Sequence, residues 1–378
     1  MKITEFAKHT KTLSASLTTL GILAFMCAVG VLTVTKNSGS LFTPTPDEET
    51  GTIPTVKERI VSAYDDMIVG FDRFISVYGI TQRVIGTSVY DDAGYTYLIR
   101  DKQDFIHFNT LPADAKPFAD AVCRFRDAME AEDIPFLYLQ SPTKEIEGYT
   151  DYPPGIDYAS TNNARAMRDA LRTAGVELVS FAEEFAARGI DPKSQFYRTD
   201  HHWTTLGAYY AYCDIMKALG RRSDIIDADA FQKEIASTDF YGTFASASGF
   251  HFVKPDSIEL WLLGNEDDFL VTADGRILEN GLYNRAFLDG NDKYSVFLDG
   301  THDVVTVTKK DGQNRPKLAI FKDSFANSVA PFLAQHFDLV LYNLSSPRTD
   351  YTDVTAYTKA CDADAALVLY TMGNVIET

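Results

Sequence analysis

The sequence Lys317-Leu318-Ala319-Ile320-Phe321-Lys322-Asp323-Ser324-Phe325 has the pattern of a buried strand that turns directly into a helix. Its first half is a short apolar run, which is typical of a parallel strand that is covered on both faces. Apolar residues at helical spacing follow over 328–336, so a polar turn lies between strand and helix. This alternation recurs along the chain and predicts an α/β fold with a parallel sheet and flanking helices.

The other predicted elements repeat the same alternation on both sides of this turn. We predict helices over 56–76, 114–132, 160–174, 204–219, 328–336 and 350–360. We predict strands over 134–139, 176–179, 317–321, 339–342 and 365–370. A hairpin is predicted over 84–99, where Gly86 and Gly94 mark turns. Residues 220–310 are richer in strands and turns, including 294–298, and we interpret them as an insertion that caps the sheet.

The composition indicates a large folded protein that is strongly acidic. The chain has 378 residues, of which 45% are hydrophobic and 12% aromatic, and its formal net charge is −18. This much apolar sequence suffices for a large core in one or two domains. The negative charge repels nucleic acid phosphates, so we expect no nucleic-acid partner.

The four cysteines, Cys27, Cys123, Cys213 and Cys361, do not form a CxxC pair. This spacing argues against a zinc ribbon or a CxxC redox motif. Three of them lie in apolar patterns with helical spacing, so we interpret them as small buried side chains. A single disulfide is the alternative.

Residues 13–35 form an uncharged, mostly apolar segment between Lys11 and Lys36. A bilayer is crossed by about 20 residues, so the segment is long enough to span one. Lysines are concentrated on its N-terminal side, which places residues 1–12 in the cytoplasm and the rest of the chain outside. We interpret the segment as an uncleaved transmembrane signal anchor, and a cleaved signal peptide is the alternative.

The segment that follows the predicted anchor contains several glycine and proline residues. Residues 36–55 are therefore predicted to be a flexible linker. It leads to an extracytoplasmic domain over 56–378. The expected location is thus the cell membrane, with a single span.

A cluster of polar and aromatic residues, Asp200-His201-His202-Trp203, precedes the helix predicted over 204–219. In an extended chain Asp200 and His202 point to the same face, and His201 points away from it. A carboxylate beside an imidazole fixes its tautomer and stabilises the imidazolium that forms when it takes a proton. The alternative is that Asp200 or Thr204 caps the helix and both histidines are incidental.

Ligands of an open parallel sheet bind at the carboxyl ends of its strands. Three predicted strands end in polar segments, at 140–144, 322–325 and 343–345. Ser324 lies on a strand-to-helix turn, where a hydroxyl is exposed and its own backbone N–H can help to bind an oxyanion. Ser324 is therefore a candidate nucleophile with His202 as its base. In the alternative interpretation, Ser324 or Asp323 only caps the following helix.

An Asp-His-His triplet also occurs in metal-dependent phosphoesterases, but the Asp-rich motifs that those enzymes need are absent from this sequence. A single zinc site formed by His201, His202 and His251 stays open. Our leading interpretation involves no metal and no organic cofactor.

The segments 199–204 and 322–325 together resemble the bacterial DHHW family. They are also similar to the SGNH-hydrolase-like acetyltransferases that O-acetylate alginate and other exported polysaccharides. The resemblance covers about residues 56–372, including Tyr241-Gly242-Thr243. It implies an SGNH-like domain over 56–378 in which Asp200 orients the base His202 and Ser324 is the nucleophile. In place of the superfamily's Gly-Asp-Ser stands Lys322-Asp323-Ser324, and the Asn that helps to bind the oxyanion has no clear match.

The resemblance implies a membrane-anchored O-acyltransferase that acetylates an exported or cell-envelope polysaccharide through an acyl-enzyme. Its implied partners are the polysaccharide acceptor and a polytopic membrane acyltransferase that delivers the acyl group. The candidates for substrate binding are Lys144, Trp203, Asn343 and Arg348. Two alternatives stay open. One is a carbohydrate esterase with the same triad, and the other is a non-catalytic glycan-binding protein, in which Ser324 and His202 would lie more than about 5 Å apart.

Overall fold

The computed structural model describes residues 23–33, 35–36, 71–92, 95–146, 148–344 and 354–370. The chain divides into two compact units, Met1–Val77 and Tyr78–Thr378. Residues 23–33 of the first unit are helical. Among the described residues, no helix combines the length and the apolar character that a membrane span requires. Of the anchor predicted over 13–35, residues 13–22 and 34 lie outside the described residues, as do most of the linker and most of the helix predicted over 56–76, and all three stay predictions.

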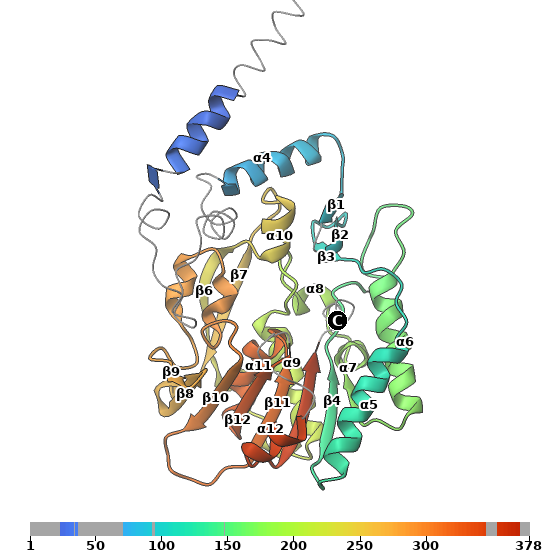
Figure 1. Cartoon of the computed structure of the whole chain (residues 1–378), viewed down its shortest axis with the longest axis vertical. Coiled ribbons are helices and arrows are strands. Elements are labelled where there is room, and N and C mark those ends of the chain that lie inside the picture. The colour runs from blue at the N-terminus through green and yellow to red at the C-terminus, as the bar shows by residue number, and fades with distance from the viewer. Residues whose placement is uncertain are drawn as a thin grey trace, which may run out of the picture. The chain divides into compact units, whose positions relative to one another are not determined.

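The second unit holds the sheet and the helices that cover it (Figure 1). The strands that position the site are β1 (Val89–Asp92), β2 (Tyr95–Arg100), β3 (Ile106–Phe108), β4 (Phe136–Gln140), β5 (Leu178–Ser180), β6 (Gln232–Phe240), β7 (Asp256–Leu262), β8 (Phe269–Ala273), β9 (Arg276–Ile277), β10 (Val304–Lys309), β11 (Lys317–Lys322), β12 (Asp338–Asn343) and β13 (Ala365–Tyr370). The α-helices are α4 (Phe71–Val84), which crosses the boundary between the units, α5 (Lys116–Glu130), α6 (Ala159–Thr173), α7 (Phe181–Ala187), α8 (Pro192–Gln195), α9 (Thr205–Ala218), α10 (Thr243–Ser248), α11 (Phe325–Leu333) and α12 (Val354–Ala360).

The central sheet has the strand order β5-β4-β13-β11-β12-β10-β8-β9. Its first five strands are parallel, as the sequence predicts. The last three pair antiparallel. Strands β8, β9 and β10 come from 220–310 and extend the sheet instead of capping it. Val305 and Val307 of β10 alternate into the core, which explains why this segment joins the sheet. Only β6 and β7 form a separate two-stranded ribbon from this region.

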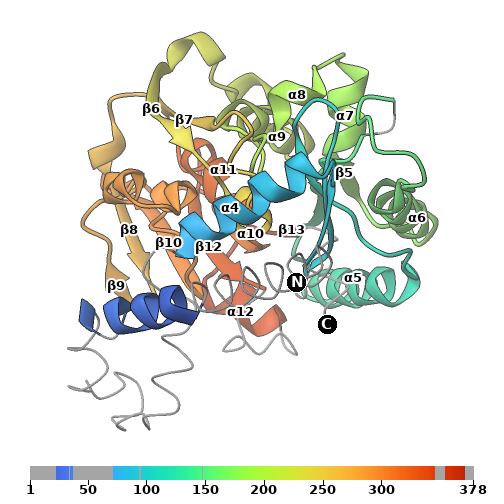
Figure 2. The same ribbon diagram turned by 90° about the horizontal axis from the view of Figure 1, so that it is seen from above.

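The parallel strands bury both of their faces. On β11, Leu318 and Ile320 belong to the core that includes α7, α9 and α11. Ala319 and Phe321 belong to the core on the opposite face, with α5, α6 and α12. Successive residues of a strand point to opposite faces, so the sheet is the middle of three layers. Figure 2 shows α9 and α12 on opposite sides of it.

Two local elements near the site differ from the sequence predictions. Helix α11 begins at Phe325, directly after Ser324, and not at residue 328. Residues 294–298, predicted as a strand, lie largely in the 3₁₀ helix η5 (Lys293–Val296). The chain then turns through Leu298, Asp299 and Gly300, which all have positive φ. The four cysteines are free, so the disulfide alternative is not observed.

Candidate active site

Asp200, His202 and Ser324 form one continuous chain of hydrogen bonds. His202 Nδ1 lies 2.6 Å from Asp200 Oδ1, and His202 Nε2 lies 2.7 Å from Ser324 Oγ. An ionised carboxylate only accepts hydrogen bonds, so Nδ1 carries the proton and Nε2 is left to accept from the serine hydroxyl. The structure therefore joins the neighbouring Asp200 and His202 to a serine that lies 122 positions after His202 in the sequence.

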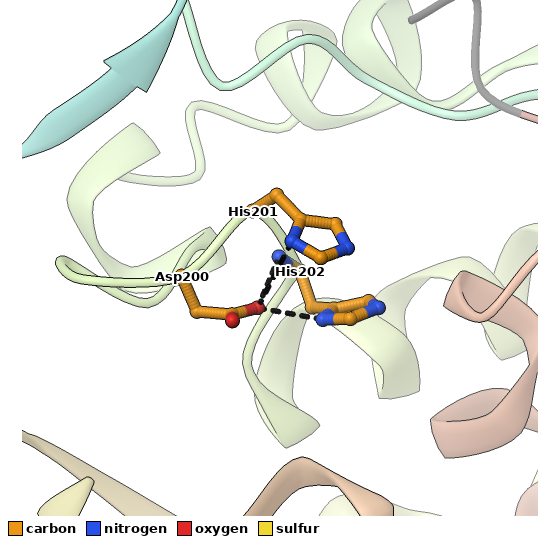
Figure 3. Close-up of side chains that lie close together, drawn as sticks. All are labelled: Asp200, His201 and His202. Carbon is orange, nitrogen blue, oxygen red and sulfur yellow. Dashed lines mark hydrogen bonds and ion pairs between the residues drawn. The ribbon is translucent and has the colours of Figure 1, made fainter. Parts of the chain in front are cut away.

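The Asp200–His202 segment is a bend and not an extended strand. Asp200 Oδ1 accepts a hydrogen bond from the backbone N–H of His202 at 2.8 Å, so the side chain closes a tight turn over its own backbone. The extended geometry assumed from the spacing is thus wrong, although the predicted Asp200–His202 pair forms. His201 does not point away, because the turn places its ring 3.8 Å from the His202 ring, centre to centre (Figure 3).

The second carboxylate oxygen of Asp200 is held by the start of α10. Asp200 Oδ2 accepts from the backbone N–H of Thr243 at 2.8 Å. A side chain at Gly242 would overlap with Asp200, so a glycine is needed at this position for the close approach. Burial alone would raise the pKa of Asp200, but the neighbouring histidines and the hydrogen bonds from His202 outweigh burial and hold that pKa below its ordinary range. Asp200 is therefore an ionised acceptor.

The His202 ring is fixed by aromatic contacts as well as by its two hydrogen bonds. Tyr294 stacks on it with ring centres 3.6 Å apart and an angle of 8° between the planes. The Tyr294 hydroxyl lies 3.2 Å from the carbonyl oxygen of Ser324 and 3.0 Å from Ser328 Oγ. One tyrosine thus contacts both ends of the His202–Ser324 pair.

Ser324 lies at the turn between β11 and α11. It is partly exposed, whereas Lys322, Asp323 and Phe325 beside it are buried. Lys322 Nζ donates to Asn327 Oδ1 at 2.7 Å, and Asn327 Nδ2 donates to the carbonyl oxygen of Gly300 at 2.9 Å. Lys322 stands where the superfamily has a glycine. Through Asn327 it connects the turn at Ser324 to the turn at residues 298–300.

Trp203 supports the site from beneath. Its side chain is fully buried. Its indole Nε1 donates to the carbonyl oxygen of Phe325 at 3.1 Å and to Ser328 Oγ at 2.9 Å. This burial does not agree with the substrate contact predicted for Trp203, since a substrate cannot reach the ring.

Lys144 is also directed inward. Its ammonium Nζ donates to the backbone carbonyl oxygens of Arg198 and Asp200, both at 2.8 Å. Burial lowers the pKa of Lys144, and the carboxylates of Asp256 and Asp200 partly oppose this effect. These contacts make Lys144 a support of the Asp200 loop. The side chain is only half-buried, so the predicted substrate contact of Lys144 stays a prediction.

The other two candidates for substrate binding are Asn343 and Arg348. Asn343 is buried at the carboxyl end of β12, and its backbone N–H donates to the carbonyl oxygen of Asp303 at 2.9 Å. Arg348 lies outside the described residues, so its role stays a prediction.

Three side chains of the site, Asp200, His201 and His202, could each offer a metal ligand, with their ligand atoms within 4.8 Å of one another. Both ring nitrogens of His202 are already hydrogen-bonded, to Asp200 and Ser324. A metal would have to break one of these bonds. His251 contacts Tyr241 and is not part of this group, so the zinc site of His201, His202 and His251 is not observed among the described residues.

Sequence reasoning missed the roles of Tyr294, Gly242 and Asp256. The motif Tyr241-Gly242-Thr243 had a recognisable resemblance, but no local pattern says that its glycine meets Asp200. Asp256 accepts hydrogen bonds from the backbone N–H groups of Arg198 and Thr199. Such contacts join residues that are far apart in the chain, so they become visible only in the folded structure.

Residues 186–343 match the family described as "DHHW protein". Residues 109–257 match the family described as "SGNH hydrolase-like domain, acetyltransferase AlgX". The two matches overlap across the Asp200–Trp203 motif. A comparison with curated proteins finds no match.

Solved structures with a similar fold span most of the second unit. PatB1 from Bacillus cereus is 20% identical, with a TM-score of 0.61 over 74% of this chain and 96% of that chain. A structure of the same protein with a sulfonyl adduct is 18% identical, with a TM-score of 0.58 over 73% and 93%. A DHHW family protein from Eubacterium siraeum is 19% identical, with a TM-score of 0.57 over 75% and 93%. At these identities the likeness shows a shared fold.

The family matches and the shared fold agree with the resemblance stated from the sequence. They confirm the mixed α/β architecture with a large sheet. Residues 186–343 of the chain are thus similar to the DHHW family, and residues 109–257 are similar to the SGNH-hydrolase-like acetyltransferase domain.

Proposed function

We propose that this chain is an O-acyltransferase that moves an acyl group, acetyl in the first instance, onto a hydroxyl of a polysaccharide outside the cytoplasm. The observation that carries the proposal is the hydrogen-bonded chain from Asp200 through His202 to Ser324. The match to an acetyltransferase domain supports transfer to an acceptor as the reaction.

In the proposed mechanism Ser324 Oγ attacks the carbonyl carbon of an acyl donor while His202 Nε2 takes the hydroxyl proton. Asp200 stabilises the imidazolium. The donor's leaving group departs with that proton, and the acyl group remains as an ester on Ser324. An acceptor hydroxyl then attacks this ester, gives its proton to His202, and leaves with the acyl group. The proton returns to Ser324 Oγ, so the enzyme is regenerated.

The same geometry bears on the two alternatives from the sequence. A non-catalytic protein was expected to hold His202 and Ser324 more than about 5 Å apart. The distance of 2.7 Å between His202 Nε2 and Ser324 Oγ argues against a non-catalytic protein. An esterase would use the same three side chains, with water in place of the sugar hydroxyl, so product analysis has to separate the two.

The membrane anchor and the donor belong to the proposal as well. The apolar segment 13–35 supports attachment to the cell membrane with the second unit outside. A donor outside the cytoplasm has to be supplied there, and we propose a polytopic membrane acyltransferase as its source.

The test is incubation of the full chain with a chromogenic acetyl ester and a panel of exported polysaccharides. We expect O-acetylated glycan, detected by mass spectrometry, from the wild-type protein. We expect none from Ser324→Ala or His202→Ala. Release of acetate without any acetylated glycan would show that the protein is an esterase and not a transferase. No turnover and no adduct on Ser324, in a folded protein, would reject both enzymes.

A further inference from the structure

We propose that Lys144 and Asp256 act together as a charged clamp on the backbone of residues 198–200, and that this clamp places Asp200 against His202. Both are positioning residues. The inference rests on the proposed function for its catalytic consequence, whereas its structural consequence can be measured independently.

The cationic half of the clamp binds carbonyl oxygens. Lys144 follows β4, and its ammonium donates to the carbonyl oxygens of Arg198 and Asp200 at 2.8 Å each. The ammonium lies 5.4 Å from the ring centre of Phe244 and 5.7 Å from that of Phe105. The two rings shield the charge, so its hydrogen bonds to the two carbonyls are stronger than they would be in water.

The anionic half binds N–H and O–H groups of the same segment. Asp256 lies at the start of β7, and its carboxylate accepts from the backbone N–H of Arg198 at 2.6 Å and of Thr199 at 2.7 Å. It also accepts from Thr199 Oγ1 at 2.6 Å. Every polar backbone group bound by Asp256 is a donor and every one bound by Lys144 is an acceptor.

A clamp is needed because residues 198–202 have no regular secondary structure. An antiparallel bridge between Phe196 and Trp203 closes the turn between α8 and α9, but no helix or strand includes Asp200 itself. Lys144 holds the carbonyl of Asp200 itself, so a rotation of this peptide would move the carboxylate that His202 needs. Charge-assisted hydrogen bonds are about twice as strong as neutral ones, which suits them to hold an irregular loop.

The two halves come from separate parts of the fold and have opposite charge. Lys144 belongs to the loop at the carboxyl end of β4, and Asp256 belongs to the β6–β7 ribbon. Each charge shifts the pKa of the other toward the ionised form, against the effect of burial. Loss of Lys144 or Asp256 therefore has two effects. It makes the ionised form of the remaining partner less favourable, and it releases the backbone of residues 198–200.

The experiment uses the full chain and the variants Lys144→Met and Asp256→Asn, singly and together. Lys102→Met is the matched control, because Lys102 pairs with Asp151 at 2.7 Å in an exposed position. The first readout is the low-field NMR signal of the His202 Nδ1–H, in protein with ¹⁵N-labelled histidine. Asp200→Asn assigns this signal. The second readout is the rate constant of Ser324 sulfonylation by phenylmethylsulfonyl fluoride.

The expected result is loss or a large upfield shift of the signal in Lys144→Met and in Asp256→Asn, and its retention in Lys102→Met. Sulfonylation should slow by about 100-fold in each clamp variant, the effect of a misplacement of about 1 Å. The double variant should lose much less than the product of the two effects, since both act on one segment.

An unchanged signal and an unchanged rate in folded Lys144→Met overturn the clamp. If Lys144→Met does not fold, Lys144→Gln decides in the same way, because its amide is one bond too short to reach both carbonyls. A wild-type protein that shows the NMR signal but is not sulfonylated would reject the proposed function. In that case the signal in the variants still supports or overturns the clamp.

Discussion

The imidazole ring of His202 is contacted by most of the other side chains of the site. Asp200 binds one of its nitrogens, Ser324 binds the other, and Tyr294 and His201 lie against its two faces. In the proposed mechanism, a ring that is held in this way needs little rearrangement when it takes the proton of Ser324, which is the advantage of a preorganised site. Burial and the neighbouring His202 keep the pKa of His201 below its usual range, so His201 adds no competing charge near neutral pH.

Substitutions at Tyr294 should separate its ring from its hydroxyl. Tyr294→Phe keeps the stack on His202 but loses the contacts with Ser324 and Ser328, and should cost about 1 kcal/mol of unfolding free energy. Tyr294→Leu also removes the stack and should slow Ser324 sulfonylation by a further factor of about five, the equivalent of about 1 kcal/mol. Chemical denaturation and labelling kinetics measure the two effects. Equal labelling rates in both variants would show that the ring does not orient His202.

At the scale of elements, the region between α9 and β11 supplies much of the support for a site whose proposed nucleophile follows a strand of the central sheet. Helix α10 provides the N–H for Asp200, β7 provides Asp256, and η5 provides Tyr294. The sheet itself contributes Ser324 at the end of β11. The site therefore depends on how these connecting elements pack against the strand ends.

Gly242→Ala tests this dependence at the start of α10. The added methyl group would overlap with the Asp200 side chain, which is already bound on both oxygens. Overpacking of this kind costs about 1–3 kcal/mol, and displacement of Asp200 should slow Ser324 labelling by about 100-fold. Gly290→Ala is the matched control, because its methyl group would meet Phe287 at an ordinary 3.5 Å. Equal behaviour of the two variants would argue against a tight fit between α10 and Asp200.

At the scale of the whole molecule, burial of histidines should make stability depend on pH. Burial lowers the pKa of His107 and of His336 in the folded chain. Below about pH 6.5 the unfolded chain takes up protons that the folded chain does not, so stability is full above that pH and falls as the pH drops through the lowered folded values.

Each of these histidines should contribute a loss of up to about 1.4 kcal/mol per pH unit in this window. Urea midpoints at about pH 7.5 and about pH 5.5 measure the loss, and His107→Gln should reduce it. The same pH dependence in wild type and His107→Gln would contradict the assignment for His107.

The parallel half of the fold could be predicted from local patterns, because continuous apolar runs such as 365–370 are typical of strands buried on both faces. Strands β8 and β10 carry weaker patterns, and their antiparallel pairing depends on tertiary contacts. The composition of residues 294–298 is typical of a strand. In the structure, however, Tyr294 stacks on His202 from within the 3₁₀ helix η5.

The sequence singled out three residues that the structure brings together, but it did not predict the geometry of their contacts. Residue types and strand-end placement were enough to single out Asp200, His202 and Ser324. The tight turn of Asp200 over His202 was not predicted, and neither were the contacts of Lys144 with the carbonyl oxygens of Arg198 and Asp200, which join segments far apart in the sequence.

The most direct test of the central claim is the trapping of an acetyl-enzyme. The full chain is mixed with an activated acetyl ester, quenched in acid and analysed by peptide mass spectrometry. The account predicts one acetyl group on the peptide that contains Ser324, formed about 1,000- to 10,000-fold more slowly in Asp200→Asn, which presents the wrong histidine tautomer. An acetyl group on another residue, or equal rates in wild type and Asp200→Asn, would contradict it.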